Sequence, residues 1–138
     1  MSRPMVVLIE DNAPNLELVR YLLTAHGFEC VPATDGPAAL KTVRQRRPDI
    51  VLCDLQMPGM DGFEVLRALR ALPHMTGVPV IEVTAYAMVG DRERILGAGF
   101  DGYIAKPLDP GRFVGQVAGF LGLPVPPRVP PEGGGSAA

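Results

Sequence analysis

Short apolar runs alternate along the chain with longer segments of helical periodicity. The apolar runs occupy residues 5–9, 30–33, 50–53, 78–84 and 103–105, and a turn signal follows each of them. The runs Val6-Val7-Leu8-Ile9 and Ile50-Val51-Leu52-Cys53 are apolar at consecutive positions, which is typical of strands buried on both faces of a parallel sheet. The pattern therefore predicts five strands that alternate with helices.

Helix signals fill the segments between these runs. Asn12 and Pro14 are typical of a helix start, and apolar residues follow them at helical spacing. A second helix is predicted behind Asp35, and two more between the later strands, with Ile95 and Leu96 marking the fourth. The fifth follows Asp109-Pro110 and contains three glycines, each of which costs roughly 1 kcal/mol relative to alanine. Packing must therefore stabilise this last helix.

Five strands and five helices in alternation predict an α/β fold, a doubly wound parallel sheet with right-handed crossovers. The 138 residues are the usual size of one domain. Residues 124–138 are rich in Pro and end in Gly-Gly-Gly-Ser-Ala-Ala, so they bury too little apolar surface to fold. We expect one domain over residues 1–123 and a flexible tail over residues 124–138.

Composition and charge exclude several classes of function. No apolar run approaches the roughly 18 residues of a membrane span, and the start of the chain lacks the pattern of a signal peptide. The formal net charge is -2, so there is no basic field for nucleic acid. We expect a soluble cytoplasmic protein that neither inserts into a membrane nor binds nucleic acid directly.

Polar residues lie at the ends of the predicted strands, at the edge where a doubly wound sheet places its site. Glu10 and Asp11 follow the first strand, Asp54 the third and Lys106 the fifth, while Thr84 ends the fourth. Carboxylates about 4 Å apart repel by roughly 4 kcal/mol, so such a cluster needs a cation or raised pKa values. Oxygen ligands favour Mg²⁺. The sequence therefore predicts a magnesium site at this edge.

These strand ends also match a known pattern. The matching stretches are Ile9-Glu10-Asp11-Asn12, Asp54-Leu55-Gln56-Met57-Pro58-Gly59-Met60-Asp61-Gly62, Val83-Thr84-Ala85 and Lys106-Pro107. Over about residues 5–123 the chain resembles the receiver domains of bacterial two-component response regulators. The resemblance implies a flavodoxin-like sheet of strand order 2-1-3-4-5. It also implies a phosphorylation switch, not an enzyme that acts on other molecules.

The resemblance assigns a role to each residue of the site. Asp54 would accept the phosphoryl group as nucleophile, Lys106 would neutralise charge on it, and Thr84 would donate its hydroxyl to a phosphoryl oxygen. Asp11 and Asp54 would bind Mg²⁺ directly. The backbone carbonyl of Gln56 would be a third protein ligand, and Glu10 would act through a metal-bound water.

Four further positions are implied by the same resemblance. Tyr103 would turn inward when Thr84 moves, and the surface formed by the fourth helix, fifth strand and fifth helix would carry the signal outward. A cis peptide bond is implied before Pro107. Gln56 and Tyr86 occupy positions that set how quickly water removes the phosphoryl group, and an aromatic Tyr86 predicts slow loss.

The expected partners are a sensor histidine kinase or a histidine phosphotransfer protein as donor, and a separate effector protein. The run Thr84-Ala85-Tyr86-Ala87-Met88 with Gly90-Asp91 resembles single-domain regulators of the DivK type and receivers of hybrid histidine kinases. Free-standing action is the leading interpretation. The alternative is a receiver module from a hybrid kinase or a multidomain response regulator, with the tail as a linker.

Other functions fit the pattern less well. Phosphatases of the haloacid-dehalogenase type have a second Asp two residues after the nucleophile, where this chain has Gln56. A nucleotide-binding module needs a Gly-rich turn, which Glu10-Asp11-Asn12-Ala13 replaces. A degenerate receiver would lack site residues that are all present here.

Glu82 does not fit the strand pattern, because it is an acid among Val80, Ile81 and Val83. A buried ionised carboxylate is costly unless it is paired. The sequence leaves three arrangements open: a place at the margin of the strand, a basic partner, or a raised pKa.

Overall fold

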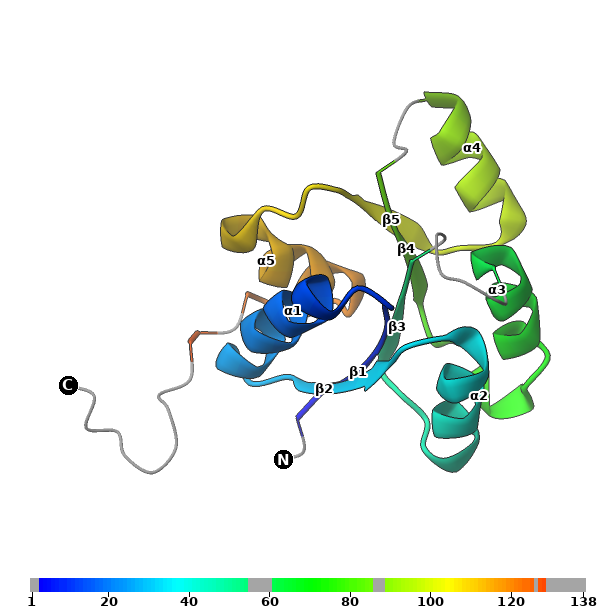
Figure 1. Cartoon of the computed structure of the whole chain (residues 1–138), viewed down its shortest axis with the longest axis horizontal. Coiled ribbons are helices and arrows are strands. Elements are labelled where there is room, and N and C mark those ends of the chain that lie inside the picture. The colour runs from blue at the N-terminus through cyan, green and yellow to red at the C-terminus, as the bar shows by residue number, and fades with distance from the viewer. Residues whose placement is uncertain (1–2, 55–60, 86–88, 126, 129–138) are drawn as a thin grey trace.

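A computed structural model describes residues 3–54, 61–85, 89–125 and 127–128 of the chain. Its centre is a five-stranded parallel sheet of order β2-β1-β3-β4-β5, the order implied by the family resemblance (Figure 1). The strands are β1 (Met5–Ile9), β2 (Glu29–Ala33), β3 (Ile50–Asp54), β4 (Val80–Thr84) and β5 (Gly102–Ala105).

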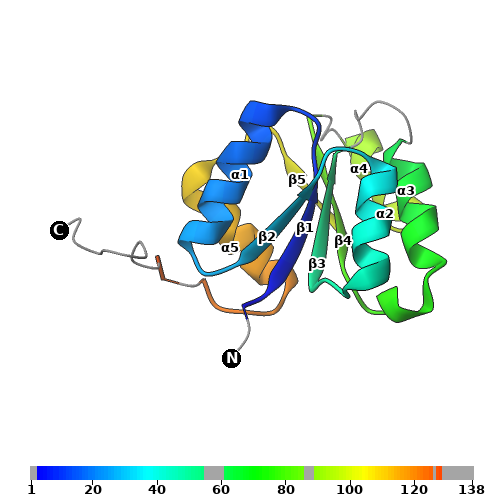
Figure 2. The same cartoon turned by 60° about the horizontal axis from the view of Figure 1, so that its bottom comes forward.

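Helices cover both faces of this sheet. They are α1 (Ala13–Ala25), α2 (Gly36–Gln45), α3 (Gly62–Arg70), the short 3-10 helix η1 (Pro73–Met75), α4 (Val89–Ala98) and α5 (Pro110–Phe120). Helices α1 and α5 lie on one face, and α2, α3 and α4 lie on the other (Figure 2). Among the described residues, no helix is both long and apolar enough to cross a membrane.

Residues of the central strands are buried on both faces, which explains their consecutive apolar residues. Val6 and Leu8 of β1 pack in the layer that contains α1 and α5, while Val7 and Ile9 pack in the layer beneath α2 and α3. Because side chains alternate along a strand, each central strand supplies both cores.

Side-chain caps fix where four helices begin, and these starts lie close to the carboxyl edge of the sheet. The side chains of Asn12, Asp35, Asp61 and Asp109 accept backbone N–H bonds at the starts of α1, α2, α3 and α5 at 2.8–2.9 Å. Such a cap contributes about 1 kcal/mol. The loops that carry the strand-end residues therefore lead directly into anchored helices.

The predicted start of the fourth strand is wrong. Strand β4 begins at Val80, not at residue 78, and Pro79 directly before it has no N–H to donate to a ladder. Helix α4 forms where Ile95 and Leu96 predict it, but Leu96 is 49% exposed while Ile95 is fully buried. Neighbouring residues on a helix point about 100° apart, so only one of the pair can face the sheet.

Candidate functional site

The strand register brings the predicted site residues together at one edge of the sheet. Ile9 is the register partner of Cys53, so the next residues, Glu10 and Asp54, lie side by side. Thr84 ends the neighbouring strand β4. Glu10, Asp54 and Thr84 are each no more than 5% exposed. Three polar side chains are thus withdrawn from water at the same place.

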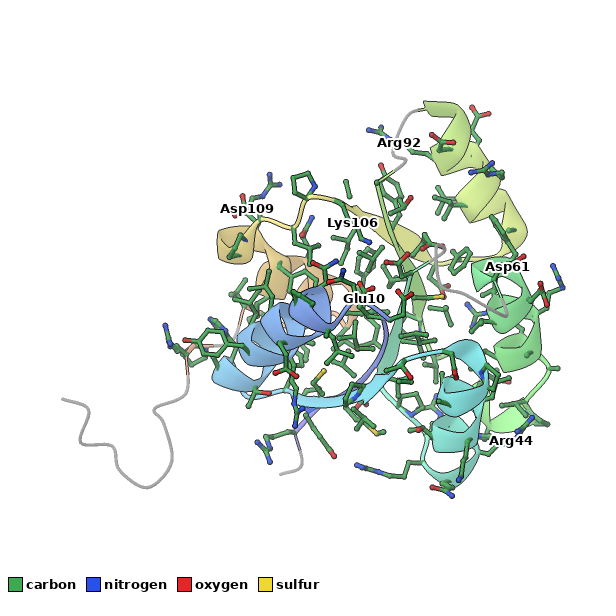
Figure 3. The ribbon with its side chains drawn as sticks, in the orientation of Figure 1. Glu10, Arg44, Asp61, Arg92, Lys106 and Asp109 are labelled. Atoms are coloured by element: carbon green, nitrogen blue, oxygen red, sulfur yellow. The ribbon has the colours of Figure 1, made fainter. Side chains whose placement is uncertain are left out.

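Lys106 enters this group from the loop between β5 and α5. Its Nζ donates to Asp54 Oδ2 at 2.5 Å, and its backbone N–H donates to the carbonyl of Thr84 at 2.8 Å. The peptide bond between Lys106 and Pro107 is cis. Figure 3 shows the side chains of Lys106 and Glu10 close to one another where the strands end.

The pKa of Lys106 reflects two opposed effects. Burial lowers it, but the hydrogen bond to Asp54 and the negative charges of Asp54, Glu10 and Glu82 outweigh burial, so the pKa lies above its ordinary value. The ammonium therefore stays charged at neutral pH. It places a fixed positive charge on the carboxylate expected to accept the phosphoryl group.

The surroundings of Glu10 disfavour its charged form. Burial raises the pKa of Glu10, and the charge of Asp54 raises it further, while the N–H of Asn12 lowers it by donating to Glu10 Oε2 at 3.2 Å. Burial is thus the main reason why the pKa of Glu10 is raised, and the neighbouring carboxylate of Asp54 adds to it. A bound cation would lower that pKa.

The donor chemistry fits a hard divalent cation. Glu10 and Asp54 offer adjacent buried carboxylates, and Asp11, the next residue after Glu10, is exposed. Within the described ranges no three His, Cys, Asp or Glu side chains are already grouped closely enough to hold a metal ion. The Lys106 ammonium meanwhile lies on Asp54, so part of the charge is balanced without a metal.

A cavity of about 420 Å³ opens beside these residues, between α1 and the loop that precedes α5. Apolar side chains such as Leu8, Val19, Leu52 and Phe113 line most of it, while Glu10, Asp54 and Lys106 stand on its polar side. Asp54 therefore lines a cavity although it is only 5% exposed.

Comparison with known proteins decides the family. Residues 6–118 match the response regulator receiver domain. The chain belongs to the response-regulator receiver family. This receiver is 41% identical over 117 residues to the polar-differentiation response regulator DivK of Brucella anthropi, a match that covers 85% of this chain and 95% of the relative. DivK of Brucella ovis is 40% identical over the same length.

Solved structures share the fold. The receiver domain of the sensor histidine kinase PA1611 from Pseudomonas aeruginosa, with a magnesium ion coordinated in its active site cleft, has a TM-score of 0.79 and 31% identity. That match covers 88% of this receiver and 99% of that domain. The chemotaxis protein CheY4 of Vibrio cholerae has a TM-score of 0.81 at 24% identity, covering 86% and 99%.

Two predicted residues lie outside the described part of the receiver. They are Gln56, the expected backbone ligand, and Tyr86, expected to slow phosphoryl loss. Tyr103 is described: it is half-buried on β5, and the guanidinium carbon of Arg92 on α4 lies 5.6 Å from its ring centroid. No sequence pattern pointed to Arg92, because the contact depends on how α4 packs over β5.

Glu82 does not lie at the margin of its strand. It is fully buried, and its register partners are Cys53 on β3 and Tyr103 on β5. Its negative charge contributes to raising the pKa of both Cys53 and Lys106, although burial is the main cause for Cys53. Of the three arrangements open from the sequence, a place at the margin of the strand is therefore wrong.

Proposed function

We propose that this receiver is a phosphorylation-dependent switch of a two-component system and that Asp54 accepts the phosphoryl group. The contact between Lys106 Nζ and Asp54 Oδ2 is the observation that carries the proposal. A carboxylate oxygen of Asp54 attacks phosphorus in line as the bond from phosphorus to the donor breaks. Charge then accumulates on the equatorial phosphoryl oxygens, within reach of the Lys106 ammonium and the Thr84 hydroxyl.

The proposal includes Mg²⁺ held by Asp11, Asp54 and the backbone carbonyl of Gln56, with Glu10 acting through a water. When bound, the ion supplies positive charge to the same phosphoryl oxygens. The adjacent buried carboxylates of Glu10 and Asp54 support a cation here. The magnesium in the PA1611 receiver domain supports the choice of metal.

The proposed partners are a sensor histidine kinase or a histidine phosphotransfer protein as donor, and a separate effector protein in the cytoplasm. Phosphorylation adds nearly two negative charges, which must be read out by an element with two arrangements. We assign that role to Thr84, Tyr103 and the surface of α4, β5 and α5. The receiver would then assist only its own phosphorylation and dephosphorylation.

Free-standing action is the proposed architecture. The match covers 95% of the DivK relative from Brucella anthropi, which therefore contains little besides a receiver. The likeness to a sensor kinase's receiver domain favours the alternative, a module of a hybrid kinase or a multidomain regulator. In either case we propose residues 1–123 as the receiver and residues 124–138 as a tail or linker.

Acetyl phosphate with and without Mg²⁺ tests the proposal, with intact mass spectrometry to detect one added phosphoryl group. We expect labelling of the wild type with Mg²⁺, little without it, and none of Asp54→Asn. Asp35→Asn is the matched control, because Asp35 caps α2 and is not among the proposed site residues. Equal labelling of Asp54→Asn and the wild type would overturn the proposal.

A further inference from the structure

The ring of Tyr103 is flanked by two residues of opposite charge type. Glu82 is its register partner on β4, is fully buried and lies on the sheet face that α3 and α4 cover. Arg92 approaches from α4, with its guanidinium carbon 5.6 Å from the ring centroid. Tyr103 itself is half-buried against the core on this face. An acid thus lies beside the tyrosine on the neighbouring strand, and a cation lies over its ring.

The acid is a hydrogen-bond acceptor at a place where apolar side chains surround the sheet. Glu82 lies beside Cys53 and within the layer that contains Ile95 and Phe100. Neighbouring strands are about 4.8 Å apart, so a tyrosine that turns inward over β4 brings its hydroxyl to the region of the Glu82 carboxylate. An inward hydroxyl needs an acceptor when it leaves water.

The cation stabilises the other position of the ring. A guanidinium within 6 Å of an aromatic centroid is attracted to the ring face. Because Arg92 belongs to an exposed part of α4, this attraction favours a ring that stays at the surface of β5. An acceptor at Glu82 and the contact from Arg92 therefore favour opposite positions of the same side chain.

We propose that Glu82 and Arg92 are positioning residues that together set the balance between the outward and inward positions of Tyr103. The carboxylate of Glu82 accepts the hydroxyl of the inward ring, and Arg92 holds the outward ring by its cation–π contact. The inference rests on the proposed function, in which Tyr103 moves when Asp54 is phosphorylated. It adds the two residues that decide how readily that movement occurs.

The substitutions are expected to change the ratio of inward to outward Tyr103 by different factors. Replacing a hydrogen bond to a charged acceptor by one to a neutral acceptor changes a two-state ratio by roughly tenfold. Removing an exposed cation–π contact changes it by roughly twofold to fivefold in the opposite direction. Glu82→Gln keeps a neutral acceptor and Glu82→Met removes it, so the inward population should fall in that order.

The experiment uses the full chain with Mg²⁺ and beryllofluoride, a mimic of the bound phosphoryl group. NMR of the β5 and α4 backbone amides reports the ratio of the two states. We expect that ratio to fall about tenfold in Glu82→Gln, to fall further in Glu82→Met, and to rise about twofold to fivefold in Arg92→Gln. Arg94→Gln is the matched control: Arg94 is on the same helix, but its guanidinium lies 6.0 Å from the ring of Phe63.

A double-mutant cycle separates positioning from structure. Without the hydroxyl, Glu82 has nothing to accept from the ring, so adding Glu82→Gln to Tyr103→Phe should leave the ratio unchanged. An equal effect of Glu82→Gln in both backgrounds, or equal effects of Arg92→Gln and Arg94→Gln, would overturn the inference. If beryllofluoride changes no amide signal of the wild type, the proposed function itself fails. If the wild type responds, and Glu82→Gln and Glu82→Met respond as strongly as the wild type, only this inference fails.

Discussion

Lys106 Nζ lies 2.5 Å from Asp54 Oδ2, although the two residues are 52 positions apart in the chain. The contact joins the loop after β5 to the end of β3, across the end of β4, where Thr84 is 3% exposed. The ammonium is thus already placed where negative charge increases when a phosphoryl group is transferred to Asp54. Preorganised charge of this kind needs no rearrangement at the moment of reaction.

Lys106→Met should slow phosphorylation of Asp54 by acetyl phosphate by roughly 100-fold or more, the usual cost of removing one preorganised group that stabilises the transition state. The variant keeps the apolar stem and removes the charge. The initial rate of labelling with Mg²⁺ measures the effect. Lys41→Met, at an exposed position on α2, is the control and should label at the wild-type rate. A Lys106→Met rate equal to that of the control would show that the contact is not used.

Gly102→Ala should destabilise the fold by about 1–3 kcal/mol, the usual cost of overpacking. A Cβ at Gly102 would lie 2.4 Å from Cε1 of Phe120, so the ring at the end of α5 would have to shift. Gly97→Ala, where a Cβ meets nothing within 4 Å, should instead be neutral or stabilise α4 by up to about 1 kcal/mol. Urea unfolding of the two variants compares them, and equal midpoints would contradict the packing described here.

Glu29→Gln should lower stability at neutral pH by a small amount that vanishes in acid. The two hydrogen bonds from Arg46, at 2.8 and 2.9 Å, hold the pKa of Glu29 below its ordinary value of 4.5. A carboxyl whose pKa is lower in the folded state stabilises the fold above the unfolded-state pKa and loses that contribution as pH falls through the folded-state pKa. Urea unfolding at neutral pH and well below pH 4.5 measures the difference.

The same experiment on an Arg46→Met background is the control for that prediction. Without the guanidinium, the effect of Glu29→Gln should no longer depend on pH. A pH dependence that persisted in Arg46→Met would assign it to another partner of Glu29.

Tyr86→Ala should shorten the lifetime of the phosphoryl group on Asp54, because family resemblance places Tyr86 where a bulky ring obstructs the attacking water. Loss of the label after removal of acetyl phosphate measures the lifetime. Tyr21→Ala provides a control for a tyrosine far along α1, where the ring contacts Arg128 of the tail. A phosphoryl lifetime in Tyr86→Ala as long as in the wild type would contradict this prediction.

The layout of the site was predictable because a parallel sheet brings all its strand ends to one edge. Glu10, Asp54 and Thr84 needed only correct strand ends, and those follow from consecutive apolar residues. The distance from Lys106 to Asp54 was not predictable from the pattern, since it depends on the path of the β5–α5 loop. Which of Ile95 and Leu96 is buried was not predictable either, because α4 is weakly amphipathic and its rotation over the sheet is decided by packing.

The complete burial of Glu82 is a second feature that the sequence alone did not predict. Its apolar neighbours place it in a strand, but only the position of β4 between β3 and β5 buries it completely. Its relation to Tyr103 and Arg92 joins three elements that are adjacent only in the folded chain. The hydrogen bond from Arg128 to Tyr21 likewise could not be predicted from the sequence of residues 124–138.

The position of the phosphoryl group tests the central claim most directly. After reaction with acetyl phosphate and Mg²⁺, borohydride reduces an acyl phosphate to an alcohol, so a phosphorylated aspartate becomes homoserine in the peptide sequence. We predict homoserine at position 54 and at no other acid. Homoserine at position 11, or a stable phosphoryl group on Thr84 with position 54 unchanged, would contradict the account.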